Sequence, residues 1–98
     1  MIVNIIKSYR DIIAICDSEL LGKRFEEGQF QLDIKESFYK GIEKSLEETI
    51  KIMEDFSSED ATFNIVGQKS VDAALQAGII DQEGIKKIQD IPFAMVLM

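Results

Sequence analysis

Few side chains in this 98-residue chain could perform chemistry. Cys16 is the single thiol, and the absence of histidine excludes imidazole-based acid–base catalysis and most zinc sites. A thiol becomes a nucleophile only beside a base or in a positive field, and only Lys23 and Arg24 follow Cys16 closely in the sequence. Cysteine is also often buried as a small hydrophobic residue. We therefore expect Cys16 to pack in the core and the chain to lack a catalytic residue.

Carboxylates are abundant, because 18 Asp and Glu residues outnumber 11 Lys and Arg residues and give a net charge of −7. Acid–base catalysis needs two carboxyl groups that converge, whereas adjacent acids such as Glu26 and Glu27 point in different directions. Residues 81–84 resemble the beginning of a calcium loop only faintly and lack its closing glutamate. We predict a solvated acidic surface, with no metal site and no cofactor.

The segment Val66-Gly67-Gln68-Lys69-Ser70 has some features of an anion-binding site. It lacks the Gly-Lys pair that ends a phosphate-binding loop. Free N–H groups at the beginning of a helix could nevertheless bind an anion there. Two interpretations stay open: an anion site at residues 64–69, or a structural role in which Gly67 only permits close packing.

Basic residues have aromatic neighbours in three places: Tyr9-Arg10, Lys23-Arg24-Phe25 and Phe38-Tyr39-Lys40. If these met on one face, they could stack unpaired bases and hold phosphates. The net charge and the seven acids between residues 43 and 60 oppose general binding of nucleic acid.

The N-terminal third of the chain predicts strands. Residues 2–9 and 11–17 are two runs rich in Ile and Val that indicate a β-hairpin. The second run is apolar on both sides, so we expect it at the centre of the sheet. Asp17 could cap a short turn that Gly22 would end. Residues 29–34 alternate polar and apolar side chains, as a strand with one wet face does.

The middle of the chain predicts two helices. After an aromatic loop at residues 37–41, Ser45 and Glu48 fit a capping box for a helix over residues 46–56. The inward side chains of that helix would be Leu46, Ile50, Met53 and Phe56.

Asn64 fits the cap of the second helix, with Gly78 as its left-handed end. Its inward side chains would be Ile65, Val71, Ala74 and Leu75. Residues 61–63 fit either a short strand or the entrance to this helix. Residues 85–88 and 93–98 predict two strands joined by a tight connection. We expect the last strand inside the sheet or at a dimer interface, because an unpaired apolar edge would aggregate.

These elements predict an α+β fold, in which a mostly antiparallel sheet of five to six strands packs with two main helices in a single domain over residues 1–98. No segment approaches the ~20 apolar residues that span a bilayer. A single cysteine cannot form a disulfide within the chain. We expect a cytoplasmic protein.

Several short motifs occur in an order and spacing typical of a known family. They are Cys-Asp-Ser-Glu-Leu-Leu-Gly-Lys at 16–23, Glu-Ser-Phe-Tyr-Lys-Gly at 36–41, Asn-Ile-Val-Gly at 64–67, Val-Asp-Ala-Ala at 71–74, Ala-Gly-Ile-Ile-Asp at 77–81 and Ile91-Pro92. Over nearly the whole chain, they resemble the archaeal domain-of-unknown-function family numbered 424. The resemblance implies a small archaeal cytosolic protein, without an established activity, in the company of translation and ribosome-maturation proteins. Members carry a His and a Gln where this chain has Phe93 and Met95, so no role of that His transfers.

The motif residues concentrate in turns and loops, where binding residues are often found. We predict a non-catalytic binding module whose surface combines Lys23, Arg24, Tyr39, Lys40, Asn64, Gly67 and Lys69. The expected partner is a protein or ribonucleoprotein of the translation apparatus, and neither DNA nor a membrane. One alternative is a small enzyme or ligand receptor that uses an anion-binding helix start at residues 64–69 and a carboxylate such as Asp17. Another is a homodimer joined through edge strands.

Overall fold

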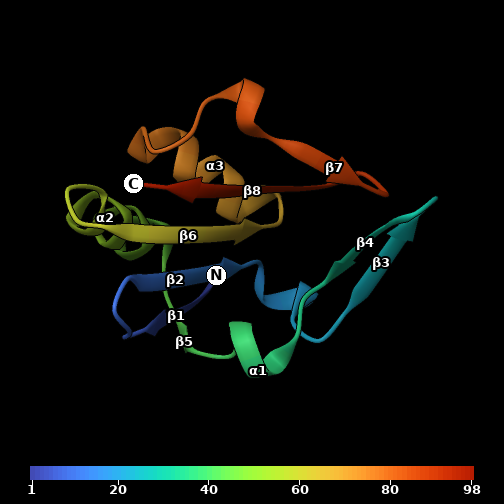
Figure 1. Cartoon of the computed structure of the whole chain (residues 1–98), viewed down its shortest axis with the longest axis horizontal. Coiled ribbons are helices and arrows are strands. Elements are labelled where there is room, and N and C mark those ends of the chain that lie inside the picture. Colours follow the sequence, from blue (N-terminus) through green and yellow to red (C-terminus); the bar gives the residue numbers. More distant parts are fainter.

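A six-stranded mixed sheet forms the centre of the computed structural model, which describes residues 1–98. Its strands are β1 (Ile2–Ile6), β2 (Asp11–Cys16), β5 (Ile42–Glu43), β6 (Ala61–Val66), β7 (Lys86–Ile88) and β8 (Ile91–Leu97). They lie in the order β5-β1-β2-β6-β8-β7. Strands β2 and β6 run parallel, and the other neighbouring pairs are antiparallel (Figure 1). The predicted α+β class is confirmed, with a parallel pair at the centre of the sheet.

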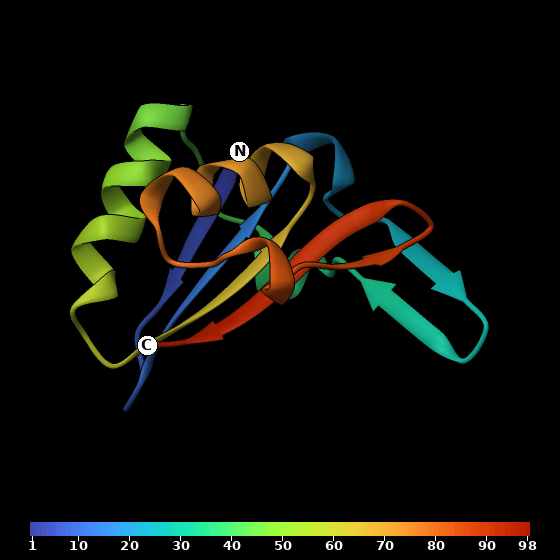
Figure 2. The ribbon, with the colours of Figure 1, turned by 90° about the horizontal axis from the view of Figure 1, so that it is seen from above.

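The two faces of the sheet are covered differently (Figure 2). Helices α2 (Leu46–Ser57) and α3 (Gln68–Ala77) lie on one face, over a core that includes Ile13, Ile15, Phe63 and Ile65. On the other face, the one-turn helix α1 (Glu36–Tyr39) and the hairpin of β3 (Arg24–Glu27) and β4 (Phe30–Asp33) cover only one end. The second core there includes Ala14, Cys16, Leu20, Ile34, Tyr39 and Val66.

Strand β2 is central, as its apolar residues on both sides predict. It pairs with β1 on one side, with Ile6 opposite Ile12, and with β6 on the other. Residues 13–16 are buried. The hairpin of β1 and β2 and the strand at β4 are also confirmed.

Helix α2 begins at the predicted capping box. The hydroxyl of Ser45 accepts the N–H of Glu48 at 3.1 Å, and the Glu48 carboxylate accepts the N–H of Ser45 at 2.9 Å. Met53 and Thr49 are its buried side chains, whereas Leu46, expected inward, is 42% exposed. Helix α3 ends at Gly78 with a φ of +77°, as predicted.

Two predictions were wrong about local structure. Asn64 lies within strand β6 (Ala61–Val66) instead of capping a helix, and residues 61–63, left open between a strand and a helix entrance, belong to the same strand. These residues form a strand because β2 and β8 flank them and pair with them. No local sequence pattern shows this stabilisation. The aromatic segment at 37–41, expected as a loop, contributes residues to helix α1, and this turn buries Tyr39 against the sheet.

Strands β7 and β8 form the predicted hairpin, with a two-residue turn in which Gln89 and Asp90 have φ values of +50° and +65°. Strand β8 lies between β6 and β7, so it is inside the sheet, as expected. However, β7 has only three residues and pairs with Ile91–Phe93 alone. No helix is both long and apolar enough to cross a membrane.

Candidate functional site

Polar side chains gather where the parallel strands β2 and β6 end. Asp17 follows β2 directly, and its N–H donates to the carbonyl of Val66 at 3.0 Å. Gly67 follows β6 and precedes α3. The carboxyl ends of parallel strands are common places for ligand sites. This edge is therefore the first candidate site.

The carboxylate of Asp17 occupies the beginning of α3. Its Oδ1 accepts the N–H and the hydroxyl of Ser70, each at 2.8 Å, and its Oδ2 accepts the N–H of Lys69 at 3.1 Å. Asp17 is only 5% exposed. These are the donors that an anion would need, so the chain's own carboxylate satisfies them. Asp17 was expected to cap the turn that follows it, but its side chain makes no hydrogen bond there.

Gly67 is required by the close approach of this carboxylate. A Cβ on residue 67 would lie 2.3 Å from Cγ of Asp17 and 2.5 Å from Oδ2, closer than real Cβ atoms come. The φ of Gly67 is +107°, which side chains rarely allow. Of the two interpretations left open by the sequence, the structure supports close packing at Gly67.

Cys16 is fully buried at the end of β2 and forms part of the second core. Burial, and then the negative charge of Asp17, raise the pKa of its thiol to about 11. Burial raises the pKa of Tyr39, in the same core, to about 12. A thiol that stays protonated and buried is a packing residue, which confirms the expectation for Cys16.

Glu43 lies at the centre of an exposed ionic cluster near the same end of the sheet. Its Oε2 lies 2.7 Å from the amino group of Met1, and the hydroxyl of Ser18 lies 2.7 Å from both carboxylate oxygens. The hydrogen bonds from Met1 and Ser18 hold the pKa of Glu43 below its usual range. All groups of this cluster therefore have partners. No group of three or more metal-ligating side chains comes together anywhere in the chain.

The seven predicted binding residues do not form one surface. Gly67 and Lys69 meet at Asp17, at the start of a helix on one face of the sheet. Tyr39 belongs to the core on the opposite face and is buried, so it cannot line a binding surface. Lys40, which follows α1, is exposed, as is Lys23.

Arg24 and Asn64 are held in two further places. The guanidinium of Arg24 donates to Glu26 at 2.8 Å and to Gln31 at 2.7 Å, within the β3–β4 hairpin. Asn64 is half-buried in the middle of β6, opposite Met95 of β8. The prediction of one combined surface was therefore wrong, since sequence order does not show on which face of the sheet a loop packs.

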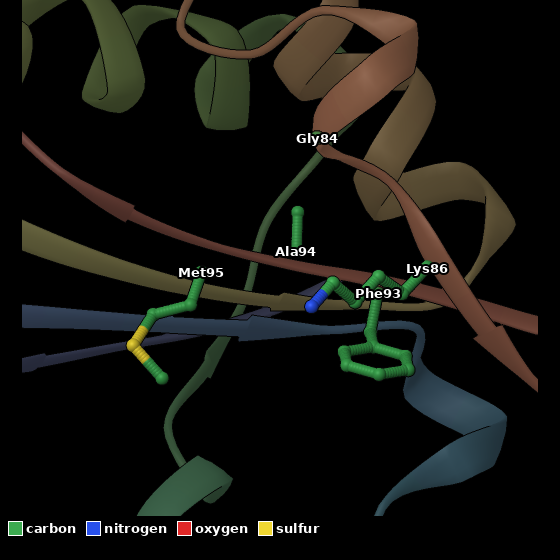
Figure 3. A pocket seen from close by; sticks show the side chains of 5 residues that line it. All are labelled: Gly84, Lys86, Phe93, Ala94 and Met95. Carbon is green, nitrogen blue, oxygen red and sulfur yellow. The ribbon is translucent and has the colours of Figure 1, made fainter.

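Sequence reasoning missed a second surface, along the outer side of β8. We call residues 94–97 on this side the free edge, because β7 ends its pairing at Phe93. Met95 and Leu97 are each 70% exposed there. A hollow of about 210 Å³, which we call the β8 hollow, is lined by Gly84, Lys86, Phe93, Ala94 and Met95 (Figure 3). Only the length of β7 creates this edge, and no pattern of residues indicates that length precisely.

Comparison with known families establishes the relationship of the chain. Residues 6–98 match the family described as "Protein of unknown function (DUF424)". The chain belongs to this family. The resemblance expected from the motifs is thereby confirmed. A search of curated proteins found no match.

The DUF424 chain is also similar to a solved structure, described as the crystal structure of an uncharacterized conserved protein from Methanopyrus kandleri. The TM-score is 0.83 at 23% sequence identity, with 98% of this chain and 90% of that chain covered. At this identity, the likeness shows a shared fold.

Proposed function

We propose that this chain is a non-catalytic binding module whose partner is a protein of the translation apparatus. One observation carries the proposal. The reactive side chains are buried or hydrogen-bonded within the chain, whereas an apolar strand edge is exposed to solvent. Cys16 is buried and Asp17 is engaged by three donors at the start of α3. Met95 and Leu97, in contrast, are exposed beside main-chain groups that no strand covers.

A protein partner fits the charge of the chain better than a nucleic acid does. The net charge is −7, and a polyanion is repelled by such a molecule unless basic residues cluster on one face. The three basic and aromatic segments do not cluster. Arg10 donates to Thr62 at 3.2 Å and to the carbonyl of Met98 at 2.6 Å, whereas Tyr39 is buried. The choice of the translation apparatus comes from the family resemblance of the motifs.

The test is sedimentation of the purified chain with ribosomal subunits from an archaeon, before and after treatment with ribonuclease. We expect the chain to sediment with a ribosomal or ribosome-associated protein and to stay with that protein after the RNA is digested. Crosslinking and mass spectrometry would identify the protein. A chain that remains at the top of the gradient, or one that is released by ribonuclease, would contradict the proposal.

A further inference from the structure

We infer that the free edge of β8 binds an extended, acidic segment of a partner protein, which adds a strand to the sheet. This inference rests on the proposed function and describes the chemistry of its partner. Three independent features lead to it: unpaired main-chain groups, an apolar hollow beside them, and two lysines without ionic partners.

The main chain of β8 presents donors and acceptors on its outer side. Toward β6, the carbonyl of Pro92 accepts the N–H of Gly67 at 2.8 Å, and the N–H of Met98 donates to Ala61 at 2.9 Å. The N–H and C=O groups of successive residues point alternately to the two sides of a strand. Those of Met95 and Leu97 therefore point outward, away from β6. Strand β7 reaches only to Phe93, so no strand lies beside these two residues. An extended peptide could pair with them as a continuation of β7.

The β8 hollow adjoins this edge and is largely apolar. The side chains of Phe93 and Met95 point to one side of β8, and Ala94 points to the other, toward Gly84 (Figure 3). An added strand would place alternate side chains on these two sides. The 210 Å³ hollow and the exposed Met95 and Leu97 would then favour apolar residues in the partner.

Lys86 and Lys87 supply positive charge at the same place. Both are exposed, and neither forms an ion pair. Lys86 lines the β8 hollow and, together with Lys87, a second hollow of about 230 Å³ that Glu27 and Phe30 of the β3–β4 hairpin also line. The nearby carboxylate of Glu27 accepts the N–H of Gln89 at 2.9 Å. In a chain of net charge −7, two unpaired lysines beside a strand edge favour a partner that carries carboxylates.

Charge also argues against a second copy of this chain as the occupant. Pairing β8 with β8 would bring together two molecules that each carry a net charge of −7. The opposite edge of the sheet leaves a shorter run free, since β5 covers Ile2 and Val3 of β1 and that strand ends at Ile6.

The experiment is a display selection of random linear peptides of about twelve residues against the immobilised full chain. We expect the selected peptides to alternate apolar residues with Asp or Glu. In NMR spectra, the best peptide should shift the amide signals of Met95 and Leu97 and slow their exchange with solvent. Lys86→Glu should weaken binding about tenfold, because it reverses the charge at the hollow. Lys35→Glu is the matched control, an exposed lysine without an ion pair, and should have little effect.

A further peptide separates strand addition from contact between side chains alone. Methylation of alternate backbone nitrogens removes donors from the peptide without changing the chain, and it should abolish binding. The inference is overturned if no peptide is selected, if those selected are basic or neutral, if their signals map elsewhere, or if the methylated peptide binds equally well. A chain that dimerises through β8 in sedimentation would also overturn it. Association with a ribosomal protein despite these results would leave the proposed function intact.

Discussion

The carboxylate of Asp17 and the N–H groups at the start of α3 satisfy each other's hydrogen bonds beside Gly67. The second helix was predicted to follow Asn64 and to offer free N–H groups at its start, but it begins later, at Gln68. Its free N–H groups donate to the carboxylate of Asp17, about fifty positions earlier in the chain. No local sequence pattern can show such a contact. Sequence reasoning therefore found the donors and missed their acceptor. The same arrangement explains why glycine stands at position 67.

Gly67→Ala should destabilise the fold by about 3 kcal/mol or more, because the Cβ would displace the Asp17 carboxylate and the backbone conformation would be strained. Gly78→Ala is the control, since Gly78 also has a positive φ but nothing lies within 4 Å of its Cβ position. It should cost only about 1 kcal/mol. Denaturation by urea measures both. Equal losses in the two variants would show that the contact with Asp17 contributes nothing.

Helix α2 and strand β6 show which elements can be predicted from local patterns. The capping box at Ser45 and Glu48 lies within four residues, and the structure confirms both of its hydrogen bonds. Strand β6 depends on its neighbours β2 and β8, which come from distant parts of the chain. Asn64 was therefore assigned to a helix cap that it does not form.

Ser45→Ala should cost about 1 kcal/mol of folding free energy, because the N–H of Glu48 loses its acceptor. Ser37→Ala, at an exposed serine of α1, should change stability by less than about 0.5 kcal/mol. Chemical denaturation compares the two. If both variants match the original chain, the capping box does not stabilise α2.

The acidic member of the box adds a pH dependence. Hydrogen bonds from the backbone and side chain of Ser45 lower the pKa of Glu48. A carboxyl group whose pKa is lower in the folded than in the unfolded state stabilises the fold above its unfolded value, about 4.3, and loses this contribution as the pH falls through the folded value. The stability difference between the original chain and Glu48→Gln should therefore shrink below pH of about 4.

The complete molecule shows where sequence reasoning reached its limit. The α+β class, the β1–β2 and β7–β8 hairpins and the central position of β2 follow from hydrophobic patterns close together in the sequence. The parallel pairing of β2 with β6 joins Asp11 to Ala61, and a preference for antiparallel neighbours could not reveal it. For the same reason, the seven predicted binding residues were assigned to one surface although the sheet separates them. The free edge was missed because it depends on where β7 stops.

The strand order has one more consequence. Strands β5, β1 and β2 come from residues before Ser58, and β6, β8 and β7 from residues after Asp60, so the sheet divides at its parallel pair into two contiguous stretches of chain. Each stretch also contributes one helix to the shared core, α2 from the first and α3 from the second.

Synthetic fragments 1–58 and 59–98 should therefore reassemble when mixed, with a stability that now rises with concentration because the covalent link is gone. Native mass spectrometry would show a one-to-one complex, and circular dichroism would show more structure than the sum of the separate pieces. If the mixture merely adds the two spectra, the loop at the division is indispensable, and the two halves are not complementary units.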